Sequence, residues 1–173
     1  MFELDKVKSM IIDVPNFPKP GIIFKDITPI FMQPQLMKDI IEEMRVRCQK
    51  WDFDIVVAPE SRGYLFGIPL ALALNKPFVF VRKKGKLPRK TICTSYTIEY
   101  GEAEIEIHQD DIKPHDRVLI VDDLLATGGT INAIEKLITK AQGKVVASMF
   151  LIELEKLNGR NKLTSDIQSI IKY

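Results

Sequence analysis

Two adjacent acids and a small-residue loop follow an apolar run in the second half of the chain. The run Val118–Val121 is rich in β-branched residues and is typical of a buried strand. Asp122 and Asp123 come next, beyond the expected end of that strand, where their carboxylates can accept hydrogen bonds from sugar hydroxyls. The loop after them has the composition of an anion site, and its candidate binding residues are Ala126, Thr127, Gly128, Gly129 and Thr130.

Backbone freedom and hydroxyl groups make this loop suitable for a phosphate. Gly128 and Gly129 let the backbone come close to an anion, and the two threonines add donors. A helical pattern begins directly after the loop, so free N–H groups and the positive end of the helix dipole would point at the anion. The alternative is that the acids only cap this helix and the glycines only make a turn. The compound strand–loop–helix pattern favours a site for a phosphorylated sugar.

A second group of polar residues lies where another expected strand ends and a helix begins. It consists of Glu60, Ser61, Arg62 and Gly63. This position again offers backbone donors to an anion, with Arg62 as a fixed cation. The alternative interpretation is a helix cap, with Ser61 as the N-cap residue.

Six cations lie within the nine residues 82–90. A run of this kind is usually a solvated loop. Beside a diphosphate, the same loop would become a lid or clamp for the charge of a leaving group. Glu99 follows in a segment rich in hydroxyl groups, and it is either a catalytic acid or base or an exposed carboxylate of a hairpin.

Apolar periodicity indicates which elements position these residues. We expect helices within 2–13, 35–50, 64–75 and 131–141, strands at 54–58, 78–81, 117–121 and within 144–154, and an antiparallel pair at 95–99 and 102–108. The second strand of that pair alternates strictly and is expected to be half exposed. This order predicts an α/β fold class, with a mainly parallel twisted sheet flanked by helices.

The length of 173 residues suggests one domain. We expect a small N-terminal hood over residues 1–34 and an α/β core over residues 35–173, with a flexible loop at about 83–100. Little can be inferred from the polar, mixed C-terminal tail.

Composition excludes several classes of function. The net charge of +2 is too small to argue for nucleic acid as a partner, and no apolar run is long enough to span a membrane. Cys48 and Cys93 form no metal-binding pair, and His108 and His115 lie near no nucleophile in the sequence. The first residues lack a signal-peptide layout, so we expect a cytoplasmic location.

The residues from Val118 to Thr130 resemble the signature of the type I phosphoribosyltransferases. Taken together, four segments are similar to the adenine phosphoribosyltransferases of that family, and they are 17–29, 60–67, 82–101 and the signature itself. The Phe-Pro-x-Pro-Gly motif at 17–21 and the Ser-Tyr-x-x-Glu-Tyr-Gly motif at 95–101 are the more specific. One departure is Lys25, which stands where arginine is common.

The resemblance implies a reaction, its substrates and a cofactor. Adenine and 5-phospho-α-D-ribose 1-diphosphate (PRPP) would give AMP and diphosphate, with Mg²⁺ held mainly by the substrate and no metal site of protein ligands. The 5′-phosphate would bind at residues 126–130, and the ribose hydroxyls would face Asp122 and Asp123. Glu99 matches the catalytic glutamate of the family.

Two further sets of residues take their roles from the resemblance. The diphosphate would bind Glu60, Ser61, Arg62, Gly63, Arg82, Lys83 and Lys86. Adenine would bind Ile23, Phe24 and Lys25, through backbone groups at Ile23 and Lys25. The family also allows for a cis Glu60–Ser61 peptide, and it implies a homodimer in which Arg82 reaches the diphosphate of the neighbouring subunit.

Two other functions are weighed against this one. The first is a phosphoribosyltransferase for another base, such as a 6-oxopurine. The second is a non-catalytic regulator that kept the ligand fold and binds nucleic acid. Near-neutral charge and the presence of Glu99 argue against the regulator.

Overall fold

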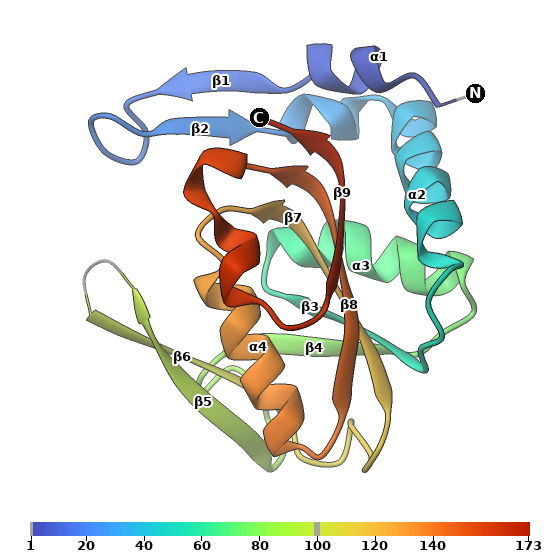
Figure 1. Cartoon of the computed structure of the whole chain (residues 1–173), viewed down its shortest axis with the longest axis vertical. Helices are drawn as coiled ribbons and strands as arrows, with labels where there is room; N and C mark the ends of the chain where they lie inside the picture. The colour runs from blue at the N-terminus through green and yellow to red at the C-terminus, as the bar shows by residue number, and fades with distance from the viewer. Residues whose placement is uncertain (1, 99–100) are drawn as a thin grey trace.

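A mixed sheet of seven strands organises the chain, which the computed structural model describes for residues 2–98 and 101–173 (Figure 1). The strand order is β5-β6-β4-β3-β7-β8-β9. The strands are β3 (Ile55–Pro59), β4 (Phe78–Lys83), β5 (Thr91–Ile98), β6 (Gly101–His108), β7 (Arg117–Leu125), β8 (Lys144–Glu153) and β9 (Asp166–Lys172). Strands β4, β3, β7, β8 and β9 are parallel, and β6 and β5 pair antiparallel at one edge, which confirms the predicted fold class.

Helices cover both faces of this sheet. Helices α2 (Pro34–Cys48) and α3 (Arg62–Ala73) share one buried core with Val56, Leu119 and Met149 of the sheet. Helix α4 (Gly129–Lys140) packs on the opposite face, against Val57 and Ile120. The helix predicted within 131–141 is confirmed, and the apolar residues on one side of it are all buried: Ile131, Ile134, Leu137, Ile138 and Ala141.

The N-terminal residues form a separate hairpin at one end of the sheet (Figure 1). Its elements are α1 (Leu4–Ser9), β1 (Ile12–Pro15), β2 (Ile23–Asp26) and the 3₁₀ helix η1 (Thr28–Met32). The predicted helix over 2–13 is therefore too long, because residues from Ile12 onward pair antiparallel with β2. Val7, Ile27 and Ile30 are buried in the core beside α2, so this segment packs firmly on the rest. The boundary at residue 34 stays a prediction.

Two strands differ from the sequence prediction. β7 runs to Leu125 rather than ending at Val121, because its pairing with β8 continues through Asp122 opposite Phe150 and Leu124 opposite Ile152. The C-terminal tail forms β9, which pairs parallel with β8 although its sequence is mixed. Pairing along a buried neighbour stabilises a strand that a weak apolar pattern does not reveal.

The predicted antiparallel pair is confirmed and is longer than expected. β5 and β6 pair from Thr91 opposite His108 to Ile98 opposite Gly101, and form an arm that extends from the sheet (Figure 1). The expectation of a half-exposed strand is wrong at Glu106 and His108, which are both buried, and the basic loop covers Glu106. Much of the segment 83–100 is strand β5, and its flexibility stays a prediction.

The order in which successive strands are added to the sheet reverses between β3 and β7. The β3–α3–β4 unit leads toward β4 and the arm, whereas β7–α4–β8 leads toward β9. The carboxyl ends of β3 and β7 thus lie side by side with their connections diverging. Open α/β sheets bind ligands in the crevice at such a reversal.

Candidate active site

Asp122 and Asp123 lie near the carboxyl end of β7 and touch each other. The Asp123 backbone N–H donates to Asp122 Oδ1 over 2.9 Å, and the Asp123 side chain is buried. Burial and the neighbouring Asp123 carboxylate raise the pKa of Asp122 well above its ordinary value. Hydrogen-bond donors or a cation would therefore stabilise the charge of the pair. Sugar hydroxyls are such donors.

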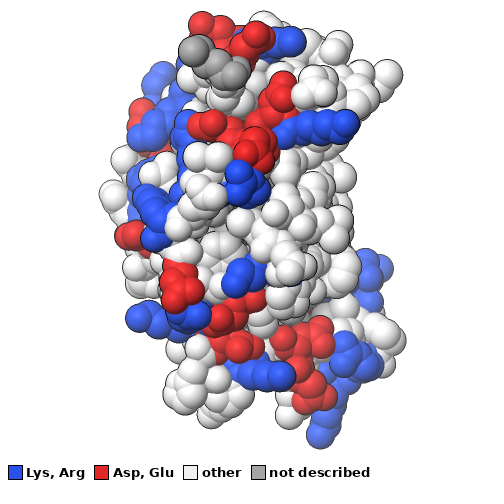
Figure 2. Space-filling model, turned by 90° about the vertical axis from the view of Figure 1, so that its right-hand side faces the viewer, with Lys and Arg blue, Asp and Glu red and all other residues white. Residues whose placement is uncertain are grey.

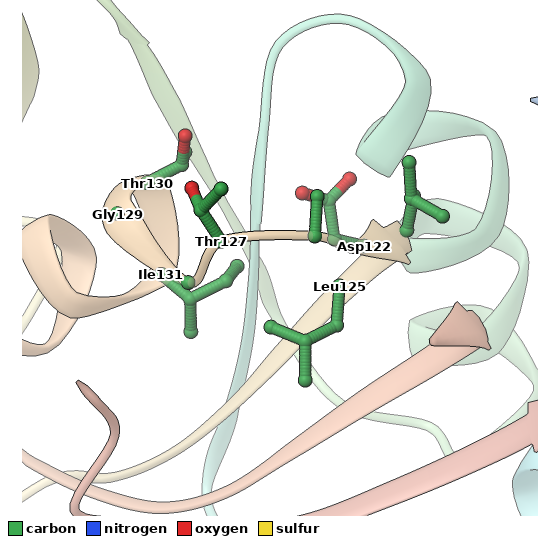
Figure 3. A pocket seen from close by; sticks show the side chains of 9 residues that line it. Asp122, Leu125, Thr127, Gly129, Thr130 and Ile131 are labelled. Carbon is green, nitrogen blue, oxygen red and sulfur yellow. The ribbon is translucent and has the colours of Figure 1, made fainter. Parts of the chain in front are cut away.

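The loop after β7 forms an open hollow with about 310 Å³ of empty space. Its lining consists of Asp122, Leu124, Leu125, Ala126, Thr127, Gly128, Gly129, Thr130 and Ile131. Figure 3 shows the Thr127 and Thr130 side chains on the same side of the loop as the Asp122 carboxylate, whereas Leu125 and Ile131 point the other way. The N-cap residue of α4 is Gly128, and no side chain caps it. The acids therefore do not serve as a cap of this helix.

Close backbone contact holds this loop in place. Gly128 has φ of +77°, and a Cβ on it would lie 2.4 Å from the carbonyl oxygen of Gly159. A Cβ on Gly159 would lie 2.3 Å from the carbonyl oxygen of Ala126. Only glycine fits at either position, so the two segments meet backbone against backbone.

Gly159 begins the 3₁₀ helix η3 (Gly159–Lys162), which follows η2 (Glu155–Leu157) after β8. The Asn132 side chain of α4 donates to the Lys162 carbonyl over 2.7 Å, and this bond ties η3 to the helix behind the loop. Gly159 could not be predicted as part of the site from the sequence. The Asn158-Gly159 pair is a turn signal, but nothing in the sequence links it to residues 126–130.

The loop between β3 and α3 reaches the same acids. Arg62 Nε lies 3.0 Å from Asp123 Oδ2, and the guanidinium carbon lies 5.0 Å from the centre of the Phe24 ring. Gly63 permits this approach, because a Cβ there would lie 3.0 Å from Asp122 Oδ1. The Glu60–Ser61 peptide is cis, and Ser61 occupies the N-cap position of α3, as the capping alternative predicts, but its side chain makes no capping hydrogen bond there.

Arg82 and Glu60 form an ion pair beside this loop. Arg82 Nε lies 2.7 Å from Glu60 Oε2, and the Lys83 backbone N–H donates to Glu60 Oε1 over 3.2 Å. Burial alone would raise the pKa of Glu60, but the hydrogen bonds from Arg82 and Lys83 outweigh it and lower the pKa. The side chains of Lys83 and Lys86 are exposed, so they remain accessible to an anion.

The three expected base-binding residues lie on β2. Phe24 packs edge-on against Phe17 with ring centres 5.2 Å apart. Lys25 Nζ lies 2.6 Å from Asp13 Oδ1 and 3.8 Å from the centre of the Tyr173 ring, whereas the Ile23 side chain is exposed. In the described part of the chain, β2 pairs only with β1, so its other edge presents unpaired backbone groups.

Three further expectations concern the catalytic glutamate, a metal site and a membrane span. Glu99 lies outside the described residues. Within residues 2–98 and 101–173, no cluster of three or more His, Cys, Asp or Glu side chains has the arrangement of a metal site. None of the helices within these residues is long and hydrophobic enough to span a membrane.

Comparison with known proteins gives consistent matches. A family model described as phosphoribosyl transferase domain matches residues 28–171. The adenine phosphoribosyltransferase of Ureaplasma parvum serovar 3 is 48% identical over 173 residues, which cover the whole of both chains.

Solved structures also match over nearly the full length. The adenine phosphoribosyltransferase from Thermoanaerobacter pseudethanolicus has a TM-score of 0.96 and 48% identity, with 99% of this chain and 100% of that chain covered. The enzyme from Saccharomyces cerevisiae, crystallised with an imino-altritol bisphosphate and adenine, has a TM-score of 0.93 and 37% identity, with 96% of this chain and 97% of that chain covered.

Proposed function

The chain belongs to the adenine phosphoribosyltransferases of the phosphoribosyltransferase family, and we propose that its site transfers the 5-phosphoribosyl group of PRPP to adenine, giving AMP and diphosphate. One observation carries the proposal. Three groups meet where the strand order reverses between β3 and β7: the Asp122–Asp123 pair, the phosphate loop at residues 126–130, and Arg62. Arg62 Nε lies 3.0 Å from Asp123 Oδ2. Groups for both ends of an activated pentose phosphate therefore lie side by side.

The sugar end is positioned by β7 and the loop that follows it. Backbone N–H groups of residues 126–130, with the Thr127 and Thr130 hydroxyls, bind the 5′-phosphate at the start of α4. Asp122 and Asp123 accept hydrogen bonds from the ribose hydroxyls. Carboxylates at this position also favour the positive charge that the ribose ring develops as the C1′–O bond breaks.

The diphosphate end is positioned by cations. The electron pair of the breaking C1′–O bond leaves with diphosphate, and residues 61–63, Lys83 and Lys86 stabilise its negative charge, together with Arg82, which in the proposed dimer reaches the diphosphate of the neighbouring subunit. Because Glu60 holds Arg82 and the Lys83 backbone, these donors are arranged before substrate arrives. Closure of the segment 83–100 would keep water from hydrolysing the activated sugar.

The base end is positioned by β2. The free backbone edge at Ile23 and Lys25 reads the edge of adenine, and Phe24 supplies an apolar face. A nitrogen of adenine attacks C1′, and Glu99 takes the proton that this nitrogen loses. Recognition through the backbone tolerates Lys25 in place of the arginine that is common there.

We propose Mg²⁺ as the cofactor, held mainly by the diphosphate of PRPP. The carboxylate oxygens of Asp122 and Asp123 fit a hard cation that keeps part of its water shell. When bound, Mg²⁺ supplies positive charge to the leaving diphosphate. Removal of divalent cations with EDTA should abolish AMP formation and excess Mg²⁺ should restore it; full activity in EDTA would contradict the proposal.

We also propose a homodimer. Leu65 and Leu72 are seven residues apart and lie on one side of α3, and their exposed fractions are 43% and 77%. Phe80 on β4 is 43% exposed, two residues before Arg82. Apolar residues of this size beside a site residue fit a subunit interface. Sedimentation should give a dimer that Leu72→Glu converts to monomer; an active wild-type monomer would contradict the proposal.

A panel of bases tests the function directly. Steady-state rates are measured with PRPP, Mg²⁺ and, in turn, adenine, hypoxanthine, guanine and orotate. We expect AMP and diphosphate from adenine and far lower rates with the other bases. A clear preference for hypoxanthine would replace the adenine assignment with a 6-oxopurine one. Binding to RNA or DNA without base-dependent release of diphosphate would favour the regulator.

We also propose a cytoplasmic location. Fractionation of the source cells tests it, and recovery of the chain in the membrane or secreted fraction would contradict it.

A further inference from the structure

Glu106 is a buried carboxylate that the reaction described above does not use. It lies on β6, and its exposed fraction is 3%. Buried charges of this kind are rare unless they are paired or fully hydrogen-bonded. Its partners are backbone groups of the basic loop, because Oε1 accepts N–H bonds from Lys86 over 3.0 Å and from Leu87 over 2.9 Å.

The electrostatics of Glu106 agree with this geometry. Burial alone would raise its pKa, but hydrogen bonds from the Leu87 and Gly85 backbones and the Thr91 side chain outweigh burial and lower the pKa. The carboxylate is therefore ionised at neutral pH. Hydrogen bonds between an ionised acceptor and backbone N–H groups are stronger than neutral ones, so the turn at 85–87 is held tightly.

A continuous set of contacts leads from this turn to the diphosphate end of the site. Arg82 lies directly opposite Glu106 in the β4–β6 pairing, and Arg82 Nη1 donates to the Lys86 carbonyl over 3.1 Å. The same guanidinium binds Glu60 through Nε. Glu60 directly precedes the loop that carries Arg62, which in turn contacts Asp123.

We propose that Glu106 is a positioning residue for the diphosphate end of the site, because it fixes the turn whose carbonyl group, at Lys86, orients Arg82. The inference rests on the proposed function. Glu106 touches no reacting atom in this scheme. It places Arg82 and Lys86 so that they meet the diphosphate without first reorganising, whereas β2, where adenine is expected to bind, joins these contacts only at their far end, where Arg62 lies over the Phe24 ring.

The chain offers a matched control on the same strand. Glu104 is two residues from Glu106 and lies on the same side of β6. Among the described residues, its carboxylate binds the exposed Lys84 side chain alone, with both oxygens 2.9 Å from Nζ. Glu104→Gln therefore removes a charge from the same face of the arm without loosening the turn at 85–87.

The experiment compares Glu106→Gln, Glu104→Gln and the wild-type chain. The Kd of inorganic diphosphate with Mg²⁺ is measured by calorimetry, and KM is measured separately for PRPP and for adenine. We expect Glu106→Gln to weaken diphosphate binding and to raise KM for PRPP by about tenfold, the effect of weakened hydrogen bonds to a charged group. KM for adenine and all constants of Glu104→Gln should stay within about twofold of wild type.

Three results would overturn the proposal: equal diphosphate affinity in Glu106→Gln and Glu104→Gln, a parallel rise in both KM values, or no binding of diphosphate by the wild-type chain. If Glu106→Gln fails to fold, Glu106→Asp keeps the charge and draws the carboxylate back by one methylene, and it should weaken diphosphate binding by a smaller factor. If the wild-type chain binds diphosphate and loses that affinity in Glu106→Gln but makes no AMP, the proposed function fails while the role of Glu106 stands.

Discussion

The loop at residues 126–130 is held by backbone contact, whereas the loop at residues 60–63 is held by charged side chains. Gly128 and Gly159 meet so closely that neither tolerates a Cβ. Glu60, by contrast, depends on Arg82 from the next strand and on the turn that Glu106 anchors. Tight backbone packing therefore holds the first loop, whereas the second loop depends on a partly exposed ion pair that one substitution can remove.

Charges of both signs are mixed on one face of the molecule. Figure 2 shows cations and acids interspersed over the face that it presents, with uncharged areas between them. Mixed signs of this kind do not produce the single-sign field that attracts nucleic acid. The cations gathered at residues 82–90 are in part tied to acids, as Lys84 is to Glu104 and Arg89 is to Asp111.

If the sugar end is the fixed part of the site, removal of its acids should cause the largest loss. We expect Asp122→Asn with Asp123→Asn to lower kcat for AMP formation by roughly 10³-fold, because both carboxylates that face the ribose lose their charge. Circular dichroism should show an intact fold, since asparagine keeps the shape of each side chain. Normal turnover in this double variant would refute the ribose role.

The base end should respond through proton transfer. We expect Glu99→Gln to lower kcat by about 10²-fold and to leave KM for adenine nearly unchanged, because the amide cannot take a proton. Steady-state kinetics with adenine varied at saturating PRPP gives both constants. A fall in kcat matched by an equal loss of adenine binding would assign Glu99 to binding instead.

The backbone contact behind the phosphate loop can be broken alone. Gly159→Ala places a Cβ 2.3 Å from the Ala126 carbonyl oxygen. We expect a loss of about 1–3 kcal/mol of stability, measured by denaturant unfolding, together with a higher KM for PRPP. Gly129→Ala is the stability control, because its Cβ would meet nothing nearer than 3.9 Å. Equal stability of the two variants would mean that the contact is not tight.

The smallest effect concerns stability and pH. The folded-state pKa of Asp122 is raised, so the folded chain binds a proton that the unfolded chain releases, and stability falls as pH rises between the two pKa values. Asp122→Asn removes this cost. We expect its Tm to exceed that of wild type by a few degrees at neutral pH, and the gain to vanish as pH falls to about 4. A gain that persists at pH 4, or a lower Tm at pH 7, would contradict this assignment.

Local sequence patterns predicted one end of the site better than the other. The strand, loop and helix at 118–141 are consecutive, so a single stretch revealed β7, the acids and the buried face of α4. Gly159 and Glu106 contact residues that are far away in the sequence. The local sequence around each of them does not show which backbone segment it will contact. Glu106 was expected to be exposed because strict alternation ignores a loop that folds over a strand. Strand β9 was missed because its pairing with β8, rather than its own composition, stabilises it.

A crystal structure with ribose 5-phosphate bound tests the central claim most directly. We predict that the phosphate lies on the loop at residues 126–130, at the start of α4, and that the ribose hydroxyls donate to Asp122 and Asp123. A phosphate bound instead at residues 60–63, with the hydroxyls away from β7, would contradict the account.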